Sequence, residues 1–175
     1  MAIAYRVALL IALTLASATG LHAKSDKATL QATSGTVSGK VQKVGFRALI
    51  LKQAIEFNLA GSARNNDDGT VQFTLQGDRK RIGRALTAIS KGTKKSAEVK
   101  VSTSPATIDP ALKTFTVVAW TSTSRNITNP YDLVFSLRAD DTVISGKKAK
   151  GVYHQILRDT LKGDDLNKLG DDDDD

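Results

Sequence analysis

The hydrophobic and polar positions divide the middle of the chain into alternating strands and helices. Thr36–Val44 carries valines separated by serine, glycine and lysine, which predicts a strand. Apolar residues then recur at spacings mostly of three and four, which predicts an amphipathic helix of about four turns. The helical positions are Phe46, Leu49, Ile50, Ala54, Ile55 and Leu59. We expect Asn58 or Gly61 to end the helix, because both residue types accept the left-handed conformation.

A hairpin and a second helix are predicted next. Ser62–Asn65 suits a short strand, and Asn66–Gly69 is a strong turn signal because Asp-Gly tolerates positive φ. Residues 70–76 alternate between apolar and polar types, as in a strand with one buried face. A helical stripe follows and stops at Gly92. The stripe consists of Ile82, Ala85, Leu86 and Ile89.

Further strands complete a recognisable order of elements. Val99 and Val101 begin one strand, and Phe115–Trp120 is an apolar run of strand length. The order strand, helix, strand, strand, helix, strand, strand is that of a ferredoxin-like βαββαβ sandwich with an added strand. We therefore predict an α+β fold in which an antiparallel-rich sheet carries two helices on one face.

The pattern of hydrophobic and polar positions changes after Thr121. We place one domain at residues 34–121 and a C-terminal extension at residues 122–175. Within the extension, Leu133–Leu137 suits one more strand, and Ala149–Leu161 has the apolar spacing of a short helix. The sequence pattern assigns no function to this extension.

The first 23 residues have the pattern of a secretory signal peptide. Arg6 supplies the positive charge, residues 7–20 form the apolar region, and Ala23 is a small residue at the cleavage site. A buried core helix is the alternative, and the apolar run is too short for a typical membrane span. Polar residues 24–33 suit a linker. We expect a periplasmic or secreted monomer with no stable membrane anchor after cleavage.

Composition narrows the possible chemistry. The chain of 175 residues has no cysteine, and its two histidines, His22 and His154, lie far apart. These facts exclude disulfides and thiolate zinc sites and argue against a histidine-built metal site, so we expect no metal and no cofactor. The net charge of +7 permits anionic partners, although the acidic block Asp171–Asp175 is expected to be solvated. No nucleic acid partner is expected, because aromatic pairs for base stacking are not evident.

The stretch GKVQKVGFR, Gly39–Arg47, has the features of an anion site. A strand-to-helix turn presents consecutive backbone N–H groups at the positive end of the helix dipole. Gly45 lets the backbone approach a ligand closely, and the planar fork of Arg47 can hold two phosphate oxygens. The alternative is an ordinary turn with a surface arginine.

Three motifs in order give a resemblance to a known family. Gly39–Arg47 is similar to GxVQGVxFR, Ala54–Asn65 to AxxxGLxGxxxN, and Asp68–Val71 to the DGTV hairpin of acylphosphatases. The resemblance covers roughly residues 36–121 and depends on the three motifs occurring together with the expected elements between them.

The resemblance implies a site and a reaction. Arg47 and a phosphate-binding loop would hold the phosphoryl group of a small acyl phosphate, or a phosphate anion, and Asn65 would hold the attacking water. The loop residues are Gln42, Lys43, Val44, Gly45 and Phe46. Hydrolysis to carboxylate and phosphate needs positioning and charge stabilisation, and the substrate's own phosphate can take the proton, so no metal is required. Asn65 could instead be a turn residue, although Asn66 is the better turn former.

This chain departs from the family pattern in the loop. Lys43 stands where the pattern has glycine, and a lysine at positive φ would cost about 1 kcal/mol. Ser62 replaces an aromatic residue, and Asn58 replaces a glycine. The alternative to an enzyme is therefore a catalytically decayed acylphosphatase-like module that binds an anion or a partner in the cell envelope. Acyl phosphates are made in the cytoplasm, which also favours this alternative for an exported chain.

Overall fold

The computed structural model describes residues 29–170. The expected signal peptide with His22, and the acidic block at residues 171–175, lie outside the described residues. None of the helices in the described part of the chain has both the length and the apolar character needed to cross a membrane.

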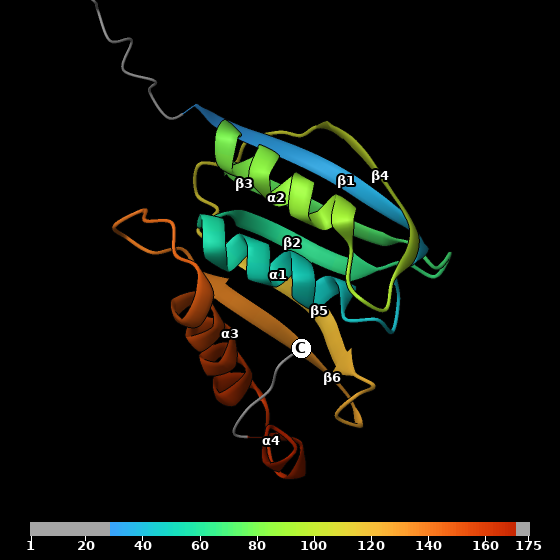
Figure 1. Cartoon of the computed structure of the whole chain (residues 1–175). Helices are drawn as coiled ribbons and strands as arrows, with labels where there is room; N and C mark the ends of the chain where they lie inside the picture. Colours follow the sequence, from blue (N-terminus) through green and yellow to red (C-terminus); the bar gives the residue numbers. More distant parts are fainter. Residues whose placement is uncertain (1–28, 171–175) are drawn as a thin grey trace, which may run out of the picture.

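The described residues form one sheet of six strands in the order β4-β1-β3-β2-β5-β6 (Figure 1). The strands are β1 (Leu30–Lys40), β2 (Ala60–Asn65), β3 (Val71–Asp78), β4 (Ala97–Pro105), β5 (Thr114–Ser122) and β6 (Ile127–Ser136). β2 and β5 are parallel, and the other neighbouring pairs are antiparallel. The sheet confirms the predicted ferredoxin-like arrangement, with added strands at the β2 edge.

The helices cover one face of this sheet (Figure 1). They are α1 (Phe46–Phe57), α2 (Arg79–Lys91) and α3 (Gly146–Thr160), and the short α4 (Asp164–Asn167) follows α3. α1 packs against α2, α3 and β5, while α3 also contacts β6. The alternation predicted for β3 is confirmed, because Val71, Phe73 and Leu75 are buried in the core beneath the helices.

β1 begins earlier than the sequence pattern suggested. Residues 30–33 fall in the range read as a linker, yet they pair with residues 75–78 of β3. The strand was missed because its alternation is weak: one face of the sheet carries no helix layer, so serine and threonine are tolerated there. The predicted end of this strand, Val44, is also too late, because β1 stops at Lys40 and a loop spans residues 41–45.

The extension after residue 121 continues the same sheet and helix layer. β6 and α3 lie where a strand and a helix were predicted. β6 begins at Ile127 and not at Leu133, and α3 begins at Gly146 and not at Ala149. The β6–α3 connection reaches the C-terminus of α1, where Asn58 adopts a left-handed conformation with φ 55° and ends the helix. The choice between Asn58 and Gly61 is therefore settled in favour of Asn58.

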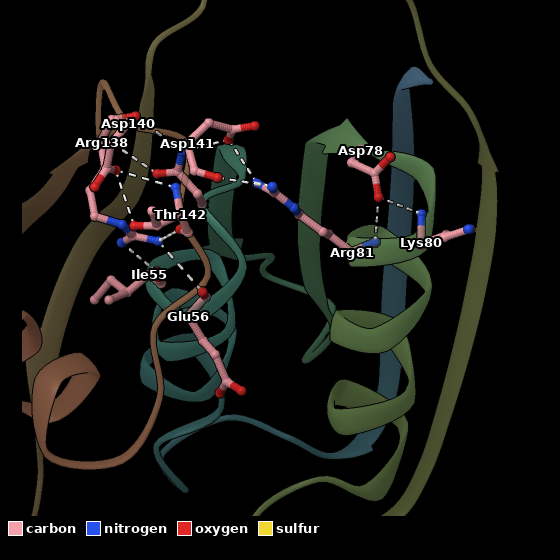
Figure 2. A network of polar contacts seen from close by, with 10 residues as sticks. Ile55, Glu56, Asp78, Lys80, Arg81, Arg138, Asp140, Asp141 and Thr142 are labelled. Carbon is pink, nitrogen blue, oxygen red and sulfur yellow. Dashed lines mark hydrogen bonds and ion pairs between the residues drawn. The ribbon is translucent and has the colours of Figure 1, made fainter. Parts of the chain in front are cut away.

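Arg138 joins the extension to α1 (Figure 2). Its Nη1 donates to the carbonyl oxygen of Ile55 at 2.7 Å, and its Nη2 donates to that of Thr142 at 2.5 Å. The Arg138 backbone N–H donates to Oδ1 of Asn58 at 2.8 Å. The last carbonyls of a helix have no partner within the helix, so Arg138 satisfies one of these groups.

Asp141 connects this junction to α2. Its Oδ1 accepts from Nδ2 of Asn58 at 2.9 Å. The same oxygen accepts from Nη1 of Arg81 at 2.7 Å (Figure 2). Burial raises the pKa of Asp141, but hydrogen bonds from Asn58 and Arg81 outweigh that effect and hold the pKa below its ordinary value. Hydrogen bonds to the end of α1 and an ion pair to Arg81 of α2 thus fix the extension to the helix layer.

We predict that Arg138→Ala lowers the free energy of unfolding by about 2 kcal/mol, because carbonyl groups at the end of α1 lose a charged donor. Chemical denaturation followed by circular dichroism measures the change. Arg158→Ala, at an exposed position on α3, is the matched control and should change stability by less than about 0.5 kcal/mol. Equal losses in the two variants would contradict a structural role for the junction.

Candidate active site

The loop at residues 41–45 opens α1 with unsatisfied backbone donors. Lys43 and Gly45 have positive φ of 59° and 75°, and Gly45 is the N-cap of α1. No side chain caps this helix, and the N–H groups of residues 43–47 donate to no acceptor within the described residues. The first turn of α1 also lacks an acidic residue. Open donors at the positive end of a helix form a binding site for an anion.

Arg47 lies in the first turn of α1 beside these donors. Its side chain is half-buried, and its Nη1 donates to the carbonyl oxygens of Val118 at 2.7 Å and Ala119 at 2.8 Å. Burial lowers the pKa of Arg47, although a guanidinium stays charged at neutral pH. Within the described residues, Nε and Nη2 have no hydrogen-bond partner, so this edge of the guanidinium is open to two oxygens of a ligand.

Asn65 is the last residue of β2 and lies at the same end of the sheet. It pairs with Val71, whose buried side chain faces the helix layer, so Asn65 lies on that face too. Ala63, two residues before Asn65, pairs with Val117 of β5, and Val117 is followed directly by Val118 and Ala119, whose carbonyl groups Arg47 contacts. The Asn65 carboxamide has no hydrogen-bond partner among the described residues, which leaves it open to water.

Gln42 braces the loop against the β2–β3 hairpin. Its Nε2 donates to the carbonyl oxygens of Asn66 at 2.7 Å and Thr70 at 2.9 Å. The side chain is therefore engaged with the hairpin that follows Asn65, a role that sequence reasoning missed. The Asn66 carboxamide donates to Oγ1 of Thr70 at 2.9 Å, so Asn66 makes the side-chain bond of the turn.

The remaining loop residues anchor it to the core. The side chains of Val44 and Phe46 are buried, so only their backbone groups can face a ligand. Oγ1 of Thr93, in the α2–β4 loop, donates to the carbonyl oxygen of Val44 at 3.0 Å. Lys43 is exposed. No cluster of three or more metal-ligating side chains occurs in the part of the chain that the structure describes.

The segment of the chain that carries these residues matches a known family. The acylphosphatase family model matches residues 33–117. The acylphosphatase of Chlorobaculum tepidum is 34% identical over 82 residues, which cover 47% of this chain and 89% of that protein. The acylphosphatase of Clostridium perfringens is 39% identical over 79 residues, which cover 45% of this chain and 89% of that protein. The chain belongs to the acylphosphatase family.

Solved structures of the same family are also similar to this chain. The crystal structure of acylphosphatase from Bacillus subtilis aligns with a TM-score of 0.48 and 27% identity, covering 53% of this chain and 100% of that one. An acylphosphatase from Coxiella burnetii aligns with a TM-score of 0.46 and 30% identity, covering 50% of this chain and 92% of that one.

We predict that Lys43→Gly raises the free energy of unfolding by up to about 1 kcal/mol, because glycine adopts a φ of 59° without the steric cost that a side chain carries there. Chemical denaturation measures the change. Lys100→Gly is the matched control at an exposed position within β4, and it should lower stability by about 0.5–1 kcal/mol. A loss of stability in Lys43→Gly as large as in the control would argue against strain at Lys43.

Proposed function

We propose that this chain hydrolyses acyl phosphates to carboxylate and inorganic phosphate. The observation that carries the proposal is that the N–H groups of residues 43–47 and two guanidinium nitrogens of Arg47, at the start of the same helix, have no acceptor among the described residues. Membership of the acylphosphatase family supports the same reaction class.

In the proposed mechanism, the loop amides and Arg47 bind the three non-bridging oxygens of the phosphoryl group. These donors stabilise the charge that gathers on those oxygens as the bond to the leaving oxygen breaks. Because the donors are fixed by the start of α1 and by β5, little reorganisation is needed when a substrate binds. The anion site therefore contributes both binding and rate acceleration.

Asn65 supplies the second half of the proposed chemistry. Its carboxamide accepts a hydrogen bond from a water molecule and holds it in line with the bond that breaks. The water oxygen bonds to phosphorus, the carboxylate leaves with the electron pair of the broken P–O bond, and a phosphate oxygen of the substrate takes the water's proton. A carboxylate is a good leaving group, so this route needs no general acid from the protein.

A second reading is a decayed module that binds an anion without turnover. The observation that favours it is Lys43, which is held at positive φ inside the loop in place of glycine. For either reading we propose export to the periplasm or the medium, on the basis of the signal-peptide pattern in residues 1–23. Fractionation of cells that express the full chain tests the location.

We predict that Arg47→Ala and Asn65→Ala each lower kcat/KM for a small acyl phosphate by at least about 100-fold, the usual loss for a transition-state donor. Release of inorganic phosphate by the purified protein measures this. Arg64→Ala is the matched control, because Arg64 is next to Asn65 but its guanidinium is bound to Oε1 of Gln72. Undiminished turnover in both site variants would remove the assigned roles, and phosphate binding by an inactive wild-type protein would favour the decayed module.

A further inference from the structure

β5 has a bulge where Arg47 contacts it. In the pairing with β6, Val117 lies opposite Leu133 and Trp120 lies opposite Tyr131. Residues 118 and 119 of β5 therefore face the single residue Asp132 of β6, which is the arrangement of a β-bulge. Ala119 has a φ of 49°, in the left-handed region that an alanine rarely adopts.

The bulge aims two carbonyl groups at one nitrogen. In a regular strand, successive carbonyls point to opposite sides, but here those of Val118 and Ala119 both accept from Nη1 of Arg47. Two acceptors on one terminal nitrogen restrict the rotation of the guanidinium. The ordering of a long side chain is then complete before an anion binds, so the anion need not bear that cost.

Asp132 holds the bulge from the other strand. Its Oδ1 accepts from the backbone N–H of Ala119 at 2.8 Å, within the bulge that interrupts the ladder between Val117 and Trp120. This side chain thus replaces the backbone acceptor that a regular pairing would supply and favours the left-handed conformation of Ala119. The chain of contacts runs from Asp132 through Ala119 to Arg47.

The rest of the extension fixes β6 beside the bulge. The buried Asp165 of α4 accepts from Nδ2 of Asn129 at 2.8 Å and from the Tyr131 hydroxyl at 2.9 Å. Nζ of Lys168 is 2.7 Å from the other carboxylate oxygen. Tyr131 precedes Asp132 in the sequence, so the hydrogen bonds to the buried Asp165 anchor the segment that carries Asp132.

We infer that Asp132 is a positioning residue for Arg47 and that the extension completes the anion site of this chain. The family match ends at residue 117, so Val118, Ala119 and Asp132 all lie beyond the matched segment. The inference depends on the proposed function for its catalytic meaning, although the orientation of Arg47 and the affinity for phosphate can be measured without turnover. The alternative is that Asp132 acts as a latch, which means that it holds the Arg47 guanidinium away from the ligand.

The test compares Asp132→Ala with Asp132→Asn, which keeps a side-chain oxygen as acceptor for the Ala119 N–H. Ser136→Ala, at an exposed position on the same strand, controls for a general weakening of β6. Isothermal titration with inorganic phosphate gives the affinity, and ¹⁵N NMR of the Arg47 guanidinium reports its mobility. Circular dichroism confirms that each variant is folded.

We expect Asp132→Ala to weaken phosphate binding roughly three- to tenfold, the range for one net hydrogen bond, and to increase the mobility of the Arg47 side chain. Asp132→Asn and Ser136→Ala should remain close to wild type. In hydrolysis, KM of Asp132→Ala should rise by a similar factor with a smaller change in kcat.

Two results would overturn the inference. If folded Asp132→Ala keeps the wild-type affinity for phosphate and the wild-type NMR signals of the Arg47 guanidinium, the bulge does not depend on this carboxylate. Tighter phosphate binding in Asp132→Ala would identify a latch instead. If the wild type binds phosphate but hydrolyses no acyl phosphate, the proposed function fails, while the affinity difference between the variants still decides the role of Asp132.

Discussion

The candidate site depends on the backbone N–H groups at the start of α1, which have no hydrogen-bond acceptor among the described residues. A helix begins with N–H groups that have no partner inside it, and most helices satisfy some of them with a capping side chain. Here the N-cap is Gly45, which offers no such side chain, and Arg47 places a positive charge within the same turn. The result is a local excess of donors and positive charge that an anion with several oxygens can satisfy.

Hydrogen bonds to neighbouring segments hold the loop and the first turn of α1 in place. Gln42 links the loop to the β2–β3 hairpin, Thr93 links it to the α2–β4 loop, and β5 fixes Arg47. Asn65 occupies the end of a strand whose neighbour in the sheet is that same β5. A preorganised set of donors is what phosphoryl transfer requires of a protein, since the reaction asks for little covalent chemistry.

Sequence reasoning identified the local parts of this arrangement. The glycine, the arginine and the hairpin are marked by residue types with strong backbone or charge preferences, so the loop with Arg47 and the hairpin could be named in advance. Asn65 was named only through the resemblance to acylphosphatases, because an asparagine beside a hairpin also suits a turn residue. The contacts of Gln42 and Asp132 could not, because each is a side chain bonded to a backbone group of another segment. The early start of β1 was missed because an uncovered sheet face imposes no hydrophobic pattern.

The most direct test of the central claim is a titration of the ¹⁵N-labelled chain with inorganic phosphate, followed by NMR. If an anion binds at the start of α1, the amide signals of residues 43–47 and the Arg47 guanidinium should shift together with a single saturation curve, while those around the Arg138 junction remain in place. If phosphate shifts only scattered exposed lysines, or leaves the α1 amides unchanged, the anion site does not exist as described.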